Sequence, residues 1–396
     1  PNEKHRFNVF ASAQHINRDS YYGGGQDPNA YGNTTDLNWM AGSQYVYSFG
    51  KCIFMPADLT AGIEFNQDKL EDNMWGYHRT VDQKVNIGSA FFQNEWKNEH
   101  WGFLIGGRLD KHNLIDHVIF SPRANLRYNP TENINLRFSY SSGFRAPQAF
   151  DEDLHVENVG GNVAMVELAD NLKEERSQSL SASADIYHRF GAFQVNFLVE
   201  GFYTKLSDVF ALTDGEVVDG ILTRTRYNAP GARVMGLTLE GKMAYLTKFQ
   251  VQAGVTLQQS HYSEPHVWNK EAPAVKKMMR TPNTYGYFTA TYTPIKPLSI
   301  ALSGTYTGSM LVPHEPVPGF LEKPITVNTK DFFDIGLKAA YDFKLYKSMN
   351  LQVNAGVQNI FNAYQNDFDK GADRDSGYIY GPSLPRSFFA GVKISY

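Results

Sequence analysis

The residues best suited to hold a ligand lie in polar stretches between predicted strands. They are histidines with neighbouring aromatic and methionine side chains, namely Trp75, Tyr77, His78, His261, Tyr262, His266, Trp268, Met310 and His314. Rings and thioethers of this kind can stack on a flat, partly apolar metal chelate such as a corrin, a porphyrin or a siderophore. Loop residues are often functional. The alternative interpretation is that these loops pack against one another or against an extracellular partner.

The other reactive residue types form no catalytic arrangement. Cys52, the single cysteine, has no motif around it and is assigned a structural role in a predicted turn. Gly23-Gly-Gly25 lacks the Lys-Ser/Thr pair of a phosphate loop. A group of aspartates could offer Ca²⁺ hard oxygen ligands, but it lacks the glycine and the final Glu of an EF-hand loop: Asp367, Asp369, Asp373 and Asp375. We therefore predict no enzyme, no resident cofactor and no metal site.

Composition excludes several classes of protein. The 396 residues are 42% hydrophobic and 14% aromatic, which is too aromatic for a disordered chain. One cysteine excludes a disulfide framework, and a net charge of -4 gives no basic field for nucleic acid. No stretch approaches the ~20 apolar residues of a membrane helix. A mean hydropathy of -0.41 by itself suggests a soluble protein.

Alternation with a period of two is the dominant pattern of the chain, and it predicts strands. Phe7, Val9, Ala11 and Ala13 alternate with polar residues, and two further runs begin at Leu37 and Leu59. Similar runs cover 85–97, 101–112, 118–129, 134–142, 177–188, 193–211, 232–246, 249–261, 284–293, 298–308, 332–344, 350–360 and 387–396. The pattern predicts about sixteen strands of about ten residues and almost no helix.

The predicted connections alternate between two classes. Short turns occur at one end of the strands, and long polar stretches occur at the other: 18–35, 68–84, 145–176, 212–231, 262–283, 309–331 and 362–386. Membrane β-barrels have short periplasmic turns and long outer loops, and only every second strand residue faces lipid. The low mean hydropathy is therefore compatible with a transmembrane, antiparallel, all-β barrel. A soluble propeller would show a repeat of about 40–50 residues, and the sequence has none.

Aromatic residues and the last strand support the barrel. Aromatic residues lie near strand ends, as in an interfacial girdle: Tyr45, Tyr47, Trp96, Trp101, Phe103, Tyr245, Phe249, Phe343 and Tyr346. The chain ends on an alternating apolar set that finishes with an aromatic residue: Phe388, Ala390, Val392, Ile394 and Tyr396. This set resembles the terminal strand of outer-membrane proteins, which the barrel-assembly machinery reads.

Several segments resemble the barrel of a TonB-dependent outer-membrane receptor of the Bacteroidetes type. The first is Gly143-Phe144-Arg145-Ala146-Pro147, followed by Asn171-Leu-Lys-Glu-Glu-Arg-Ser177, in which Glu174 departs from the family's usual acidic-proline order. The second is the Val-Gln-Asn359-Ile-Phe361 box, and the third is Tyr378-Ile-Tyr-Gly-Pro382. The match runs from about residue 85 to the end of the chain. These boxes identify no substrate.

The resemblance implies a 22-stranded barrel whose lumen holds a globular plug. Residues 1–396 then correspond to the C-terminal part of the barrel, about sixteen strands, without the plug, the first six strands or the TonB box. The start at Pro1, without an initiator Met, is consistent with this expectation. Expected partners are the TonB complex (through a preceding region), the plug domain, a surface lipoprotein and the lipid or lipopolysaccharide of the bacterial outer membrane, with no nucleic acid.

The resemblance also gives particular residues possible roles. Haem receptors place an iron-ligating histidine between comparable boxes, which makes His155 a candidate, although the run around it could be a family loop whatever the ligand. Arg145 could line the barrel mouth, with a structural role as the favoured interpretation. Charged residues predicted to face inward would contact the plug: Glu64, Arg108, Asp110, Arg123, Arg127 and Arg137.

The function that this resemblance implies is energised uptake of a scarce nutrient. The expected substrates are metal chelates, namely cobalamin, haem or a ferric siderophore, in no fixed order. Two alternatives stay open. A complete sixteen-stranded porin would allow passive diffusion, and a barrel of the same fold could serve only for adhesion or for docking a surface lipoprotein.

Overall fold

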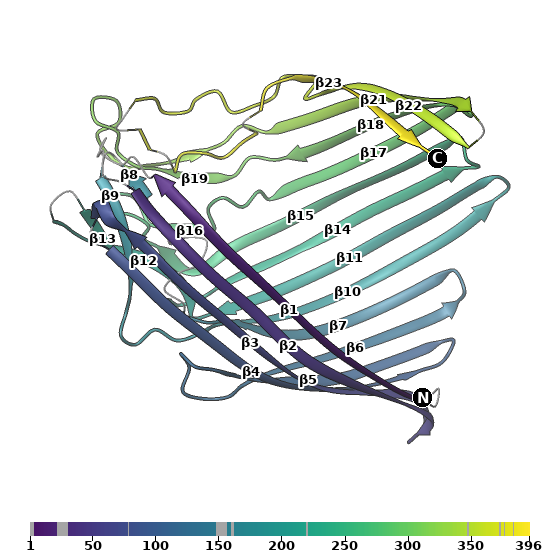
Figure 1. Cartoon of the computed structure of the whole chain (residues 1–396), viewed down its shortest axis with the longest axis horizontal. Coiled ribbons are helices and arrows are strands. Elements are labelled where there is room, and N and C mark those ends of the chain that lie inside the picture. The colour runs from purple at the N-terminus through teal and green to yellow at the C-terminus, as the bar shows by residue number, and fades with distance from the viewer. Residues whose placement is uncertain are drawn as a thin grey trace.

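The chain forms one strongly curved antiparallel sheet whose strands run side by side in sequence order (Figure 1). The computed structural model describes residues 4–21, 31–77, 79–147, 157–159, 162–218, 221–346, 348–371, 374–375, 377–382 and 384–396. We call the end of the sheet with the short connections the turn end, and the end with the long connections the loop end. Strand β1 begins and β23 ends at the turn end (Figure 1).

Sixteen long strands form a meander in which each strand pairs antiparallel with the next. They are β1 (His5–Tyr21), β2 (Tyr31–Cys52), β3 (Met55–Met74), β4 (Arg79–Lys97), β5 (Trp101–His112), β6 (Ile119–Thr131), β7 (Ile134–Arg145), β10 (Glu175–Phe190), β11 (Phe193–Ser207), β14 (Ala232–Tyr245), β15 (Phe249–His266), β17 (Thr284–Ile295), β18 (Leu298–Thr307), β21 (Phe332–Tyr346), β22 (Met349–Gln358) and β23 (Ser387–Ser395). A short strand, β16 (Val275–Lys277), adds to β15 and makes the sheet 17-stranded. The predicted all-β antiparallel sheet of about sixteen strands is therefore confirmed.

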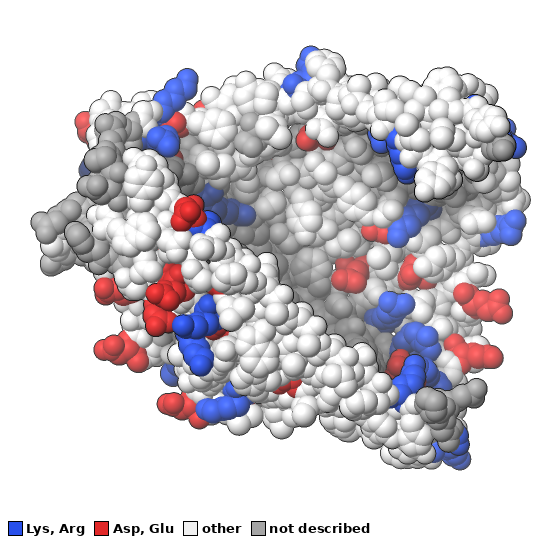
Figure 2. All heavy atoms as spheres, viewed as in Figure 1, with Lys and Arg blue, Asp and Glu red and all other residues white. Residues whose placement is uncertain are grey.

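The sheet curls without closing on itself. Among the described residues, β1 pairs with β2 alone and β23 with β22 alone, so both are edge strands. We call this curved sheet the wall. The space-filling view shows a deep hollow bounded by the wall (Figure 2). Within the described part of the chain, no helix is long and apolar enough to cross a membrane.

The first strands are longer than the sequence predicts. Strand β2 has 22 residues and β3 has 20, so the described residues of the expected loops 18–35 and 68–84 mostly continue the β1–β2 and β3–β4 hairpins. Polar side chains pair across these extensions; Asn33, for example, donates hydrogen bonds to Asn17 and Asp19, both at 2.9 Å. One face of these extensions is buried, and polar side chains on it pair with each other: Thr34 of β2 donates a hydrogen bond to Asp72 of β3. The polar composition therefore does not mark the strand ends.

Short strands occupy part of the remaining predicted loops. Four of them form a second sheet at the loop end: β8 (Glu157–Val159), β9 (Asn162–Leu168), β12 (Val209–Val218) and β13 (Ile221–Ala229). In this sheet β9 and β13 pair in parallel, which joins two loops distant in sequence. A hairpin of β19 (Leu311–His314) and β20 (Ile325–Asn328) and one turn of 3₁₀ helix, η2 (Trp75–Tyr77), complete the loop end.

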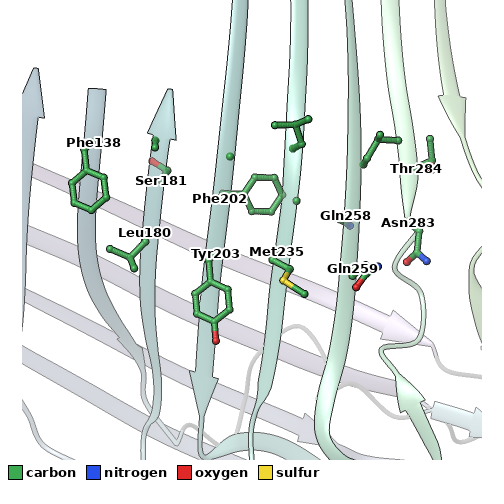
Figure 3. A pocket seen from close by; sticks show the side chains of 15 residues that line it. Phe138, Leu180, Ser181, Phe202, Tyr203, Met235, Gln258, Gln259, Asn283 and Thr284 are labelled. Carbon is green, nitrogen blue, oxygen red and sulfur yellow. The ribbon is translucent and has the colours of Figure 1, made fainter. Parts of the chain in front are cut away.

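The two faces of the long sheet differ in polarity. On β10, Leu180, Ala182, Ala184 and Ile186 lie on one face, and the serines at 177, 179, 181 and 183 lie on the other. In Figure 3 the side chains of Phe138, Leu180 and Tyr203 stand toward the viewer, with strands of the opposite wall behind them. The apolar face is therefore the outer face of the wall, and the polar face lines the hollow.

Near the turn end, one row of ring-bearing residues crosses the outer face. The strand register places these residues directly opposite one another in succession: Phe190, Phe193, Tyr245, Phe249 and Tyr292. The nine aromatic residues that the sequence places near strand ends also all lie toward the turn end. The structure thus contains a continuous aromatic girdle at this end, as membrane barrels have at an interface.

Buried apolar side chains gather at the loop end, away from the middle of the wall. One cluster contains Ile115, Ile119 and Ala146, with Phe144 packed against it. Another contains Met310, Val312 and Tyr378. These clusters hold the loops in place, since neither face of a one-layer wall can supply a core of its own.

Candidate functional site

Glu315 ties three long connections together at the loop end. Its Oε1 accepts a hydrogen bond from Arg224 of β13 at 3.3 Å, and its Oε2 accepts one from Asn269 at 2.9 Å. Its backbone N–H donates to Asp375 at 2.9 Å. The Glu315 and Arg224 side chains are both only about one-eighth exposed, so this ion pair is well shielded from water. These residues belong to a larger group that we call the loop cluster: Arg224, Asn269, Met310, His314, Glu315, Gln365, Asp367, Asp369, Asp375, Tyr378 and Tyr380.

His314 is fixed between a carboxylate and an aromatic ring. Its Nε2 lies 2.8 Å from Asp369 Oδ2, and its ring stacks on Tyr378 with 3.8 Å between ring centroids and an interplanar angle of 7°. Asp369 also accepts a hydrogen bond from the Asp375 backbone N–H at 3.2 Å. His314 is 5% exposed and Met310 is 8% exposed. Both side chains are used in packing the β18–β21 loop against the β22–β23 loop.

Two tyrosines of the Tyr378-Ile-Tyr380 segment share one carboxylate. Asp367 accepts hydrogen bonds from Tyr380 Oη at 2.7 Å and from Tyr378 Oη at 3.2 Å. Burial, together with the charge and hydrogen bond of Asp367, raises the pKa of Tyr378 to about 12 and raises the pKa of Tyr380 further. Gln365, which is fully buried, donates to the Tyr378 carbonyl and accepts from the Tyr380 N–H. These bonds hold residues 365–369 against 377–382.

The predicted ligand-binding residues fall into separate groups. Met310 and His314 are buried in the loop cluster, which matches the interpretation that loops pack on one another. Their partners, such as Asp369, are 55 positions away in the chain, so their packing role could not be read from neighbouring residues. His261 lies on the outer face of β15, opposite Arg233, and so points away from the hollow.

The other predicted residues are rings at the loop end that differ in exposure. Trp75 in η2 is 59% exposed. Tyr262 and His266 contact each other with 4.9 Å between ring centroids. The Trp268 indole N–H is buried and has no hydrogen-bond partner among the described residues. Tyr77 ends η2, while His78 and His155 lie outside the described residues, so the haem-ligand hypothesis for His155 stays a prediction.

The Gly143–Pro147 box anchors the second sheet to the wall. The Arg145 guanidinium lies 5.5 Å from the centroid of the Phe210 ring, and that of Arg226 lies 5.8 Å from it. The Phe210 backbone N–H donates to Glu175 at 3.0 Å, and Ala146 joins the buried cluster with Ile115. Arg145 thus contacts the second sheet, and its structural role stays a prediction.

The second box fixes the start of the β22–β23 loop. Asn359 is 2% exposed and has a positive φ of 50°. Its side chain donates to the carbonyls of Ala363 and Leu384, both at 3.0 Å, and accepts from the Ala363 N–H at 2.8 Å. Phe361, by contrast, is exposed and lies near Phe333. Asn359 is thus the structural residue of this box.

The inner wall carries a charged cluster around Arg108. This guanidinium contacts Glu64 and Asp110, each at 2.8 Å, and donates to Ser89 Oγ at 2.7 Å. The cluster borders a recess of about 440 Å³ that is also lined by Arg123. The prediction that charged residues line the hollow is confirmed for this part of the wall.

The loop end is organised by hydrogen bonds and packing between its own segments. Among the described residues, no group of three or more His, Cys, Asp or Glu side chains is placed to hold a metal ion. The residues that organise the loop end and that sequence reasoning missed are Glu315, Arg224, Gln365 and Arg280. Arg280 donates to the carbonyls of Gly377 and Ile379, 97 and 99 positions away. No pattern among neighbouring residues predicts contacts between segments so distant in the sequence.

The comparisons with known proteins agree with this architecture. A family model described as TonB dependent receptor-like, beta-barrel matches residues 2–360. No curated protein matches the sequence.

Several solved receptor structures have a similar fold. A mutant of the ferric enterobactin receptor PfeA from Pseudomonas aeruginosa is 17% identical with a TM-score of 0.68, over 99% of this chain and 58% of that one. The siderophore receptor PirA from Acinetobacter baumannii is 15% identical with a TM-score of 0.68, over 98% and 59%. The ferric-catecholate import receptor Fiu from E. coli K12 is 14% identical with a TM-score of 0.70, over 99% and 62%. The chain thus spans about three fifths of the length of these receptors.

Proposed function

The chain belongs to the TonB-dependent receptor-like β-barrel family, and from this premise we propose that the whole protein imports a ferric siderophore across the outer membrane. The observation that carries the proposal is the family match over residues 2–360. The barrel fold of this family is an outer-membrane fold. The aromatic girdle at the turn end then marks the periplasmic interface, and the loop end is extracellular.

We propose further that the complete barrel contains more strands and a plug. The free edges of β1 and β23 support this, because an unpaired strand edge in a membrane is costly. The length ratio to the similar receptors supports it as well. The charged inner wall around Arg108 suits hydrogen bonds and ion pairs with a plug more than contact with lipid.

The ligand proposal rests on the kind of receptor that the fold resembles and on three rings at the loop end, of which Trp75 is exposed and Tyr262 and His266 are half-buried. The three similar structures are named as a ferric enterobactin receptor, a siderophore receptor and a ferric-catecholate import receptor. Trp75 and the Tyr262–His266 pair can stack on the aromatic groups of an iron chelate. The loop cluster holds the surrounding loops in a defined arrangement, which reduces the entropy lost on binding. A TonB complex is the proposed energy source, and a surface lipoprotein, as in Bacteroidetes-type systems, is a proposed accessory partner.

Uptake by cells that produce the full-length protein tests the proposal. Radioactive iron supplied as a ferric catecholate should accumulate, and a protonophore or deletion of tonB should abolish accumulation. Haem and cobalamin are supplied in parallel as competing substrates. Accumulation that continues without a proton-motive force would show a passive pore, and uptake of haem or cobalamin alone would replace the siderophore.

Substitutions at these loop-end rings test the site. Since stacking of this kind is worth ~1 kcal/mol per ring, replacing Trp75 by Ala should raise the Kd for the ferric catecholate by about five-fold, and replacing Tyr262 and His266 together by about thirty-fold. Tyr128→Ala is a matched control, because this ring lies near the turn end, stacked on Trp101. Unchanged affinity in the loop-end variants would place the ligand elsewhere.

A further inference from the structure

The outer face of the wall has a groove at strands β10, β11, β14 and β15. Its volume is about 890 Å³, which lies in the range of small-molecule sites. Its floor is formed by the small residues Ala182 and Gly201, which lie opposite each other in the register. A Cβ added to Gly201 would meet nothing within 4 Å, so the glycine leaves open space.

Larger apolar side chains border this floor. Leu180, Tyr203, Leu237 and Leu257 surround it on neighbouring strands, and all four are about 40–50% exposed. In Figure 3, Leu180 and Tyr203 stand toward the viewer on the outer face, as does Met235. The groove is therefore an apolar depression that opens toward the membrane.

A row of basic residues crosses the same strands on the extracellular side of the groove. The register pairs Lys205 with Arg233, Arg233 with His261, and His261 with Lys277 of β16. Lys205 lies two positions from the outward-facing Tyr203 on β11, and Arg233 lies two positions from Met235 on β14. His261 lies directly opposite Arg233, and Lys277 lies opposite His261. All four residues therefore belong to the outer face. In the described part of the chain, Lys205, Arg233 and Lys277 form no salt bridge. The row thus carries at least three uncompensated positive charges.

The basic row lies about one membrane thickness from the aromatic girdle. Phe193 belongs to the girdle and Lys205 to the row, on the same strand β11. These twelve positions span ~40 Å at ~3.4 Å per residue, or ~30 Å along the membrane normal for a tilt of ~40°. This distance equals the thickness of the hydrocarbon core of a bilayer, ~30 Å. Lys205 and Arg233 therefore lie at the level of the lipid headgroups of the outer leaflet.

We propose that this surface is a specific site for a phosphorylated, multiply acylated glycolipid of the outer leaflet, of the lipid A type. Its acyl chains lie in the groove over Ala182 and Gly201. Its phosphates bind Lys205 and Arg233, because guanidinium and ammonium groups form charge-assisted hydrogen bonds with phosphate oxygens. The charge of the row selects a phosphorylated headgroup, and the groove selects an acylated molecule. The site depends on the barrel's place in the outer membrane and is independent of the substrate carried.

Native mass spectrometry of the full-length protein in non-ionic detergent tests this site. The probes are bis-phosphorylated lipid A, the same lipid with its phosphates removed, phosphatidylglycerol and phosphatidylethanolamine. We expect bis-phosphorylated lipid A to bind at least about ten-fold more tightly than any of the others. Equal retention of phosphatidylglycerol or phosphatidylethanolamine would overturn the proposal, since it would show an unselective lipid surface.

Two variants separate the roles of charge and shape. Lys205→Gln with Arg233→Gln should weaken bis-phosphorylated lipid A by about ten-fold or more and leave the phosphate-free lipid unchanged. Gly201→Leu fills the groove and should weaken both lipids equally. The matched controls are Arg189→Gln with Lys248→Gln near the turn end, and Gly241→Leu, an outward-facing glycine of β14 whose added Cβ would also meet nothing within 4 Å. The proposed site is wrong if the control variants lose as much binding as the site variants. It is also wrong if the site variants lose no binding. Heat-modifiable electrophoretic mobility shows that each variant is folded.

Discussion

Single buried polar side chains hold the connections of the loop end in place. Asn359 is the clearest example, because its side chain makes three hydrogen bonds and its backbone has a left-handed conformation that asparagine tolerates better than most residues. Glu315 and Gln365 act in the same way, each joining segments that are distant in sequence. The loop end is therefore ordered by a few specific bonds in addition to its small apolar clusters.

Replacing Asn359 by Ala should release the start of the β22–β23 loop. The change leaves two carbonyls and one N–H without their partners in a buried place, at a cost of ~1–3 kcal/mol. Limited proteolysis should therefore cleave residues 360–386 about ten-fold faster or more. Asn354→Ala in β22, the strand that ends just before Asn359, is the control, since no described partner bonds to that side chain. Equal cleavage of both variants would show that the Asn359 bonds are unimportant.

The tyrosines that share Asp367 make the loop cluster sensitive to alkaline pH. Burial and Asp367 raise the pKa of Tyr378 from 10.0 to about 12. A group whose pKa is higher in the folded state contributes its stability in full below the unfolded value. We therefore expect this contribution to be complete below pH 10 and to be lost as the pH rises to about 12. Tyrosinate absorbance in a pH titration should show a late component, and Tyr378→Phe should reduce it, leaving the contribution of Tyr380; titration of every tyrosine near pH 10 would contradict this.

At the scale of the strands, several inward-facing rings lie flat over glycines of the neighbouring strand. A Cβ added to Gly62 would meet the Phe91 ring at 2.3 Å and the Ser43 carbonyl oxygen at 2.6 Å. The same relation joins Gly42 with Phe10 and Gly356 with Phe389. These pairs keep the inner wall smooth while supplying strand packing that glycine alone lacks.

Gly62→Val should therefore destabilise the β3–β4 pairing. The carbonyl contact is with backbone and cannot move easily, so we expect a cost of ~1–3 kcal/mol. Gly88→Val on β4 is the matched control, because a Cβ there would meet nothing within 4 Å. Unfolding in denaturant, followed by heat-modifiable mobility, measures the difference. A larger loss in the Gly88 variant would show that β propensity and packing, and not this close approach, decide the outcome.

The whole molecule is a wall with one apolar and one polar face. Neighbouring positions of β22 show this, because Val353 lies on the outer face in register with Val392 and Asn354 lies on the inner face. Among the described residues the wall has two free edges, which we propose are closed by further strands of the same protein. Its outer face then meets lipid everywhere, while its inner face meets water and the proposed plug.

Val353→Arg and Asn354→Arg separate these two faces. A cation on the lipid face near the middle of the membrane costs ~2–4 kcal/mol, whereas lumen positions tolerate charge. We expect the Val353 variant to unfold at lower denaturant concentration in lipid vesicles and the Asn354 variant to behave like the wild type. A reversed order would mean that the inner and outer faces are assigned the wrong way round.

Much of this protein could be predicted from its sequence. Alternation with a period of two gave the strands, and the alternation of short and long connections gave the two ends of the sheet. The boxes around Arg145 and Asn359 indicated the family that the model match then confirmed. These features are local, because strand faces and turns depend on neighbouring residues.

The loop end was decided by tertiary structure alone. Met310 and His314 looked like ligand-binding residues, yet they are buried by partners such as Asp369, 55 positions away. The polar stretches 18–35 and 68–84 looked like loops, yet their described residues are mostly paired strand, because polar side chains such as Thr34 and Asp72 are buried against each other across the strands. The basic row of Lys205 and Arg233 is likewise invisible in sequence, because only the pairing register sets residues of different strands side by side. Which face a residue occupies is a local property, but which residues it meets depends on how the whole sheet folds.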